Sequence, residues 1–261
     1  MITTELTFAE YRAIAGINAS AIKKGRTSML HMHHEMTKAE TPSTPAQRRG
    51  TLIHLRTLEP DRFNEDVVVY DGTKRGKKWD EFKENNEGKE VLTPLEVTYY
   101  NLIYDKIMEH PEARMLIEES QHEVSMQWEG TYGMGKARAD MVSDFIADLK
   151  STGTVDPVKL QKHTFNQGWH IQMGWITEGL ETLGRQDMTS YIIAVEQEAP
   201  HDVAVFEMDD DYVKMGQDEA HKLAVKYRAC ELDGKFQGCV DGIQTLSAPE
   251  YAKEKKDDWV L

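Results

Sequence analysis

Residues 136–150 read KARADMVSDFIADLK and hold two short runs suited to β-strands, with turn residues at positions 143–144 between them. Asp140 lies near the end of the first run, and Asp148 lies near the end of the second. A tight turn would place the two strands side by side. Because Asp148 and Lys150 are two residues apart, their side chains point to the same face of a strand. The stretch therefore predicts two carboxylates and one amine gathered on neighbouring strands.

Two carboxylates beside a lysine are the groups needed to hydrolyse a phosphodiester with bound Mg²⁺. Hard oxygen ligands hold the ion, which polarises the phosphate and lowers the pKa of a bound water. The lysine can position that water or balance the developing negative charge. However, an Asp-x-Lys triplet is common at solvated strand ends, so the spacing alone leaves a purely structural interpretation open.

Further strands are predicted on both sides of this stretch. One strand, Glu123 to Trp128, precedes it, and two follow it, at Tyr191 to Val195 and Val203 to Phe206. Helical patterns come before, between and after the strands. This order predicts an α/β fold with a mixed central sheet flanked by helices.

The helices are recognised by apolar spacing and by capping residues. An early helix runs from Ala46 to Leu58, and Thr93 to Glu96 combines a capping box with a proline at the first helical position. Three- and four-residue spacing from Phe165 to Leu183 predicts one long helix, with Phe165 and Trp169 in the core. A last amphipathic helix follows Asp209–Asp211.

A basic, glycine-containing stretch from Asp71 to Trp79 is predicted to be a loop. Its cations are candidates for contacting a DNA backbone: Lys74, Arg75, Lys77 and Lys78. A run of charges is more often simply solvated. The stretch is no nucleotide-binding P-loop, because its Gly-to-Gly-Lys gap is one residue short and Lys78 stands where Ser or Thr is required.

Composition favours one globular domain. Of the 261 residues, 39% are hydrophobic and 29% are charged, which is enough apolar material for a core. No internal repeat or low-complexity linker divides the chain. We expect a single domain over residues 1–261, with a mainly helical part at 1–120 and a sheet-centred catalytic core at 121–261.

Charge and cysteine content restrict the class of protein. A net charge of −14 argues against a protein that coats DNA, but allows an enzyme with one locally basic groove. No apolar run approaches the roughly 20 residues of a membrane span, and the N-terminus does not resemble a secretory signal. Cys230 and Cys239 are too few for a four-thiolate cluster and fit a reducing compartment, so we expect a cytoplasmic protein.

Several motifs occur in a specific order along nearly the whole chain: Tyr11–Ser20, Gly50–His54, Leu58–Phe63, Arg138–Asp140, Asp148–Lys150 and Trp169–Gln172. In this order the chain resembles the RecE-type exonucleases (exodeoxyribonuclease eight) of prophage and phage recombination systems. These are relatives of lambda exonuclease and the RecB nuclease domain. The resemblance implies a restriction-endonuclease-like PD-(D/E)xK core with an N-terminal helical region.

The resemblance also implies roles for individual residues. Its metal ligands would be His54, Glu123, Asp140, Asp148 and the carbonyl of Leu149. Lys150 would orient or activate the attacking water, and Gln172 would steady the lysine or the DNA. The ions would be Mg²⁺, with Mn²⁺ as an alternative and two ions in the site. Without the resemblance, His54 is better interpreted as a histidine at the core edge and Glu123 as a polar strand residue.

Two positions depart from the family pattern. Ala139 stands where a proline usually precedes the first aspartate, which affects the backbone rather than the chemistry. Ile176 stands where an aromatic residue is expected, with Trp175 one position early, and this weakens a detailed role for Gln172. The related CRISPR-adaptation nucleases use a four-cysteine iron–sulfur cluster, which this chain cannot build.

As a family member, the protein would be a Mg²⁺-dependent exonuclease that resects linear double-stranded DNA from 5′ to 3′ for single-strand annealing recombination. The resemblance implies a homo-oligomeric ring around double-stranded DNA ends and a phage-type single-strand annealing protein as partner. Two alternatives are an endonuclease or repair nuclease on the same fold, and a non-catalytic module that binds DNA or a recombination partner.

Overall fold

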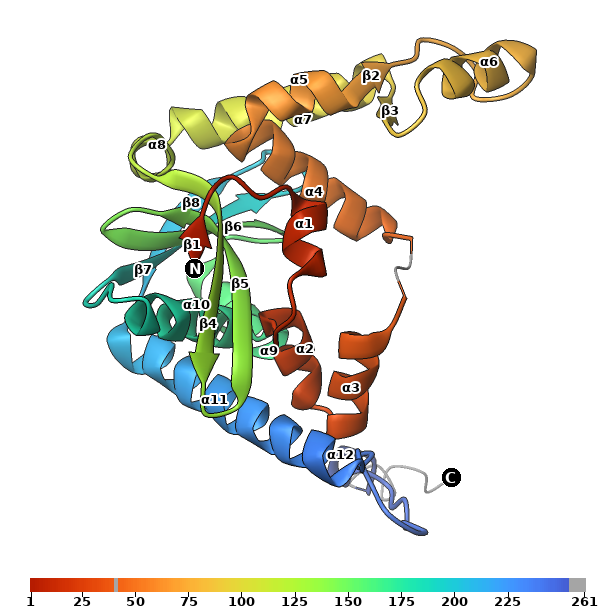
Figure 1. Ribbon diagram of the computed structural model, residues 1–261. Helices are drawn as coiled ribbons and strands as arrows, with labels where there is room; N and C mark the ends of the chain where they lie inside the picture. The colour runs from red at the N-terminus through yellow and green to blue at the C-terminus, as the bar shows by residue number, and fades with distance from the viewer. Residues whose placement is uncertain (40–41, 254–261) are drawn as a thin grey trace, which may run out of the picture.

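A six-stranded sheet organises the computed structural model, which describes residues 1–39 and 42–253 (Figure 1). The strands follow the order β1-β4-β5-β6-β7-β8. Their bounds are Ile2–Thr3 for β1, Gln121–Gly130 for β4, Gly133–Val142 for β5, Phe145–Thr152 for β6, Thr189–Glu196 for β7 and Val203–Met208 for β8. Neighbouring strands are antiparallel except β6 and β7, which are parallel. The predicted mixed sheet is confirmed.

Tight turns align the three strands at the centre of the sequence. Gly130 pairs with Gly133 at the end of the β4–β5 hairpin, and Gly133 takes a φ of 93° that favours glycine. The Ser143 N–H donates to the Phe145 carbonyl at 2.9 Å, closing the turn between β5 and β6. As a result, β5 and β6 lie side by side, as the sequence predicts.

Helices cover both faces of the sheet (Figure 1). One core contains apolar residues of the sheet together with α2 (Ala19–Gly25), α10 (Trp169–Thr182) and α11 (Asp210–Asp233). The second core contains sheet residues together with four other helices: α4 (Pro45–Leu58), α5 (Pro60–Asp66), α7 (Pro94–Glu109) and α8 (Pro111–Glu118). The sheet is therefore the middle layer of three. Among the described residues, no helix has the length and apolar character needed to cross a membrane.

Side-chain caps fix the starts of the early helices. Thr7, Thr44 and Thr93 each form a capping box with the residue three positions later, which satisfies backbone N–H groups of the first helical turn. These caps begin α1 (Phe8–Ala13), α4 and α7. Asn18 caps α2 and Ser28 caps α3 (Met29–Thr37). The short α12 (Glu250–Lys253) is the last helix of the described residues.

The prediction of one long helix from Phe165 to Leu183 is wrong. Gly168 takes the left-handed conformation with a φ of 67° and separates α9 (Pro157–Gln167) from α10. The apolar spacing continues across the break, so periodicity alone does not reveal it. Trp169 is buried as expected, but Phe165 is 44% exposed and is not a core residue.

Helices α10 and α11 cross in backbone contact. A Cβ atom added to Gly174 would lie 2.1 Å from the Gln217 nitrogen, and one added to Gly216 would lie 2.0 Å from the His170 carbonyl oxygen. Both distances are far below van der Waals contact, so only glycine fits. This crossing fixes the position of α10 against the sheet.

Residues 67–92 form an arm that extends away from the central sheet (Figure 1). It contains the two-stranded parallel sheet of β2 (Val67–Val69) and β3 (Glu90–Leu92), with α6 (Lys77–Asn85) between them. The predicted loop from Asp71 to Trp79 is therefore wrong from Lys77 onward, where a helix begins. Tyr70, Trp79 and Phe82 pack together and give the arm a small aromatic core.

Candidate active site

Three elements bring potential metal ligands together. His54 comes from α4, Glu123 from β4 and Asp140 from β5, and their ligand atoms lie within 4.8 Å of one another. The His54 Nδ1 atom lies 3.3 Å from Asp140 Oδ2. We call His54, Glu123 and Asp140 the acidic cluster. It unites three predicted metal ligands that are far apart in the sequence.

Glu123 reaches this cluster through an unusual backbone conformation. Its φ of 54° lies in the left-handed region, which residues other than glycine seldom adopt. In the β4–β5 pairing, His122 lies opposite Met141 and Val124 lies opposite Ala139. Glu123 and Asp140 fall between these two pairs and are not themselves a paired position of the sheet. Strained residues of this kind concentrate at functional sites.

Asp140 occupies the fork where β5 and β6 separate. Pairing between these strands is limited to Met141↔Ala147 and Val142↔Ile146. Beyond those pairs, the Leu149 N–H donates to Asp140 Oδ2 at 2.9 Å. The carboxylate thus replaces the carbonyl that a continuous ladder would supply, and it is held beside the backbone that leads to Lys150.

Asp148 and Lys150 form a second group on the same strand. The two side chains are in ion-pair contact, so they share a face as the sequence predicts. The Gln172 amide nitrogen on α10 donates to Asp148 Oδ1 at 2.7 Å, and its Oε1 atom lies 3.5 Å from Lys150 Nζ. Lys23 of α2 donates to the same Oε1 at 3.2 Å. We call Lys23, Asp148, Lys150 and Gln172 the lysine cluster.

Burial disfavours the charged forms of the three side chains in the acidic cluster. Desolvation, followed by the charge of Asp148, raises the pKa of Asp140 to about 8. Burial and the nearby Asp140 raise the pKa of Glu123, although its 2.6 Å ion pair with Arg138 acts in the opposite direction. Burial and Lys150 lower the pKa of His54, which favours the neutral imidazole that binds metals. Two half-buried carboxyl groups and one neutral imidazole fit a divalent cation.

The lysine cluster carries the opposite charge. Burial acts to lower the pKa of Lys150, but the carboxylates of Asp148 and Asp140 outweigh it and raise the pKa. Lys150 is therefore an ammonium group. Sequence reasoning missed Lys23, because only the docking of α2 against α10 brings it to Gln172, which is 149 positions later in the chain.

The other predicted site residues lie in different surroundings. Leu149 is buried between Asp148 and Lys150, and its backbone N–H donates to Asp140 Oδ2. The predicted DNA-binding cations belong to the arm. Lys74 donates to the Val91 carbonyl at 3.2 Å, and Lys77 lies 3.6 Å from Glu81. Arg75 and Lys78 have no ion-pair partner in the described part of the chain.

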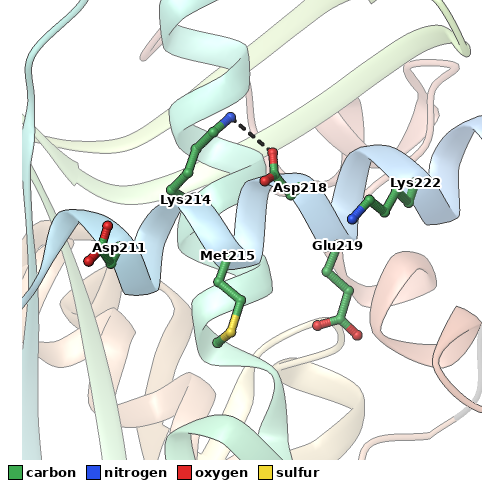
Figure 2. A pocket seen from close by; sticks show the side chains of 6 residues that line it. All are labelled: Asp211, Lys214, Met215, Asp218, Glu219 and Lys222. Carbon is green, nitrogen blue, oxygen red and sulfur yellow. Dashed lines mark ion pairs between the residues drawn. The ribbon is translucent and has the colours of Figure 1, made fainter.

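A surface hollow on α11 lies outside both clusters (Figure 2). Its lining comes from α11 alone: Asp211, Lys214, Met215, Asp218, Glu219 and Lys222. Lys214 and Asp218 form an ion pair at 2.9 Å. The lining holds three carboxylates and two lysines, and no residue of the acidic or lysine cluster contributes to it.

Sequence comparison identifies a family. The family described as "PDDEXK-like domain of unknown function (DUF3799)" matches residues 19–239. This range is most of the chain and includes every residue of the acidic and lysine clusters. A search of curated proteins gives no match.

Solved structures share the fold at low sequence identity. A protein from Eubacterium rectale, provisionally named an exonuclease, has a TM-score of 0.61 and 13% identity, covering 97% of this chain and 99% of its own. LHK-Exo in complex with dAMP has a TM-score of 0.42 and 16% identity, and the match covers 87% of this chain and 95% of LHK-Exo. A phage-related exonuclease from Haemophilus somnus has a TM-score of 0.37 and 13% identity, and the match covers 84% of this chain and 96% of that exonuclease. Only the first of these supports the fold, and at this identity none assigns an activity.

Proposed function

Because the chain belongs to the PDDEXK-like family described as DUF3799, we propose that it is a metal-dependent deoxyribonuclease. One observation carries the proposal. The acidic cluster, which suits a divalent cation, is joined through the backbone of Leu149 to the Asp148–Lys150 ion pair. Cation ligands and an ammonium group on adjacent strands are what phosphodiester hydrolysis requires. A solvated Asp-x-Lys strand end is a weaker explanation, because Asp148 is only 1% exposed.

Each residue has a task in this proposal. His54, Glu123 and Asp140 would hold the cation, which when bound polarises the phosphate and lowers the pKa of an attacking water. Asp148, paired with Lys150, would add a further carboxylate beside the cation site. Lys150, as an ammonium, would orient the water and balance negative charge instead of accepting a proton. Gln172 would hold Asp148 Oδ1 in place.

The cation would be Mg²⁺ or Mn²⁺. The carboxylate oxygens of Glu123 and Asp140 suit either ion, and the imidazole of His54 favours Mn²⁺ more than an all-oxygen site would. A second ion would need the Asp148 carboxylate, which lies outside the acidic cluster and is paired with Lys150. We therefore propose that the acidic cluster takes the first ion.

The finer proposal is 5′-to-3′ resection of linear double-stranded DNA for single-strand annealing recombination. It rests on the sequence resemblance to RecE-type exonucleases. With it come a homo-oligomeric ring around the DNA end, a phage-type annealing protein as partner, and a cytoplasmic location. A ring with a basic lumen would also reconcile DNA binding with the net charge of −14.

Purified protein with Mg²⁺ or Mn²⁺ should digest linear duplex DNA and spare covalently closed circles. Asp148→Asn and Lys150→Met should each lower the rate by at least about 10³-fold, because each removes a charge needed in the transition state. Far-UV circular dichroism would show whether these variants remain folded. Exposed Lys24→Gln is the matched control and should keep the wild-type rate.

The outcomes separate the candidate functions. Cleavage of closed circles would replace the exonuclease by an endonuclease or repair nuclease on the same fold. If no DNA is cut and calorimetry detects no binding of Mg²⁺ or Mn²⁺, the chain is instead a non-catalytic binding module. Wild-type rates in Asp148→Asn or Lys150→Met would mean that the active site lies elsewhere.

A further inference from the structure

Two ammonium groups converge on one amide oxygen in the lysine cluster. Lys23 Nζ lies 3.2 Å and Lys150 Nζ 3.5 Å from Gln172 Oε1. The nearby carboxylate, Asp148, is already in contact with Lys150. Lys23 has no ion-pair partner in the described part of the chain, so this part of the site holds one more positive than negative charge.

The position of Lys23 is fixed by the fold. Its helix α2 is capped by Asn18, and the neighbouring residues Ala21 and Ile22 are fully buried. The aliphatic part of Lys23 lies over the break between α9 and α10, where a Cβ on Gly168 would approach it to 3.1 Å. The ammonium is therefore held beside Gln172 by a rigid helix and by a glycine that leaves it room.

An ammonium in this position is costly while no anion is present. Burial, followed by the charge of Lys150, lowers the pKa of Lys23 to about 8. One amide oxygen satisfies only one of its three donors. A retained buried cation of this kind is stabilised when an anionic ligand binds beside it.

We propose that Lys23 binds a phosphate group of the DNA strand that is cut, an inference that rests on the proposed nuclease function. Through the Gln172 amide it is coupled to Asp148 and Lys150, so a phosphate at Lys150 lies beside Lys23. The phosphate is either the scissile one or its neighbour on the same strand. A purely positioning role, in which Lys23 only orients Gln172, is the competing explanation.

The test compares Lys23→Gln and Lys23→Arg with Lys24→Gln, a neighbouring exposed lysine on the same helix. Cleavage of a short linear duplex is measured with Mn²⁺ over a range of DNA concentrations. Lys23→Gln should lower kcat/KM about 10- to 100-fold, the effect of losing one charge-assisted hydrogen bond. Lys23→Arg should retain most of the activity, and Lys24→Gln should stay within about twofold of the wild type.

Binding of the same duplex in EDTA, followed by fluorescence anisotropy at several NaCl concentrations, separates charge from positioning. Loss of one phosphate contact should reduce the slope of log Kd against log salt by about 0.9. An unchanged slope in Lys23→Gln would overturn the proposal, even if cleavage became slower. A fall in kcat assigns the contact to the scissile phosphate, whereas a rise in KM assigns it to the neighbouring phosphate.

Failure of this inference is distinguishable from failure of the proposed function. A wild type that cuts DNA, together with a Lys23→Gln variant that has wild-type kcat/KM and salt slope, would reject only the role of Lys23. A wild type that binds DNA without cutting it would reject the nuclease, and the salt slope would still test Lys23. Matching melting temperatures would verify that Lys23→Gln is folded.

Discussion

The acidic and lysine clusters lie next to each other but have opposite electrostatic imbalances. In the acidic cluster, burial and a neighbouring carboxylate raise the pKa values of Glu123 and Asp140, so their anionic forms lack sufficient positive charge nearby. In the lysine cluster, burial and Lys150 lower the pKa of Lys23, so its cationic form lacks sufficient negative charge nearby. The first imbalance favours a cation and the second an anion. A metal ion and a phosphate together would satisfy both, as expected for a metal-dependent nuclease.

The two clusters are also held differently. The acidic cluster draws on α4, where a Cβ atom added to Gly50 would meet Ser151 Oγ of β6 at 3.7 Å, an ordinary van der Waals contact. The lysine cluster draws on α10, which is in backbone contact with α11 at Gly174. The helix that carries Gln172 therefore has a closer helix contact at Gly174 than the helix that carries His54 has at Gly50. This difference and the difference in charge can each be tested.

The largest expected effect concerns the cation. Mn²⁺ at about 100 times its Kd should increase the free energy of unfolding of the wild type by about 2.7 kcal/mol, because only the folded protein assembles the acidic cluster. Asp140→Asn should lose most of this increase, since it removes a ligand charge. Urea unfolding in Mn²⁺ and in EDTA measures both values.

Lys150→Met is the control for this comparison. It alters the lysine cluster but leaves His54, Glu123 and Asp140 intact, so it should keep the increase in stability. Equal stabilisation of the wild type and Asp140→Asn would mean that the ion binds elsewhere. Loss of stabilisation in Lys150→Met would mean that the two clusters do not act separately.

A smaller effect is expected from the paired substitutions Gly174→Ala and Gly50→Ala. Both replace a helical glycine, and intrinsic propensity favours each change by about 1 kcal/mol. At Gly174 the new Cβ would meet the Gln217 nitrogen at 2.1 Å, so overpacking should produce a net destabilisation of roughly 1–3 kcal/mol. At Gly50 the nearest atom is Ser151 Oγ at 3.7 Å, so the variant should be neutral or stabilised.

Urea unfolding in EDTA compares the two variants without any contribution from bound metal. If Gly174→Ala were as stable as Gly50→Ala, the α10–α11 crossing would have room for a side chain at Gly174. If Gly50→Ala were the less stable variant, the contact of α4 with β6 at Gly50 would be tighter than the contact of α10 with α11 at Gly174. Either result would reverse the structural comparison.

The sequence predicted the features that depend on neighbouring residues. Alternating patterns and tight turns identified β4, β5 and β6, and the capping box at Thr93 identified the start of α7. The spacing of Asp148 and Lys150 correctly predicted that they share a face, because side chains alternate along any strand. Local periodicity is thus sufficient for this part of the candidate site.

The features that the sequence did not predict depend on tertiary contacts or on a single backbone angle. The left-handed conformation of Gly168 divides a continuous apolar pattern into α9 and α10. The left-handed conformation of Glu123 directs its carboxylate toward Asp140, which no spacing rule anticipates. Lys23 joins the site only because α2 docks on α10. Such positions follow from packing rather than from local pattern.

The smallest effect is expected at the arm, outside both clusters. Lys77 and Lys78 are exposed at the start of α6, so a DNA contact there would be solvated and screened by salt. The double change Lys77→Ala with Lys78→Ala should raise KM about two- to fivefold and leave kcat unchanged, because rim charges act mainly on encounter. The matched control is the double change Lys214→Ala with Lys222→Ala on α11, which should leave KM unchanged.

Steady-state cleavage of linear duplex at low and moderate NaCl distinguishes two explanations for the arm. If its cations contact the DNA backbone, the increase in KM should shrink as salt rises, because the wild type loses the same attraction. An unchanged KM at low salt would show that Lys77 and Lys78 are only a solvated helix face. The acidic and lysine clusters would then carry the DNA contacts without the arm. A fall in kcat would contradict the prediction that the arm acts only on DNA binding, since it would link the arm to the reacting phosphate.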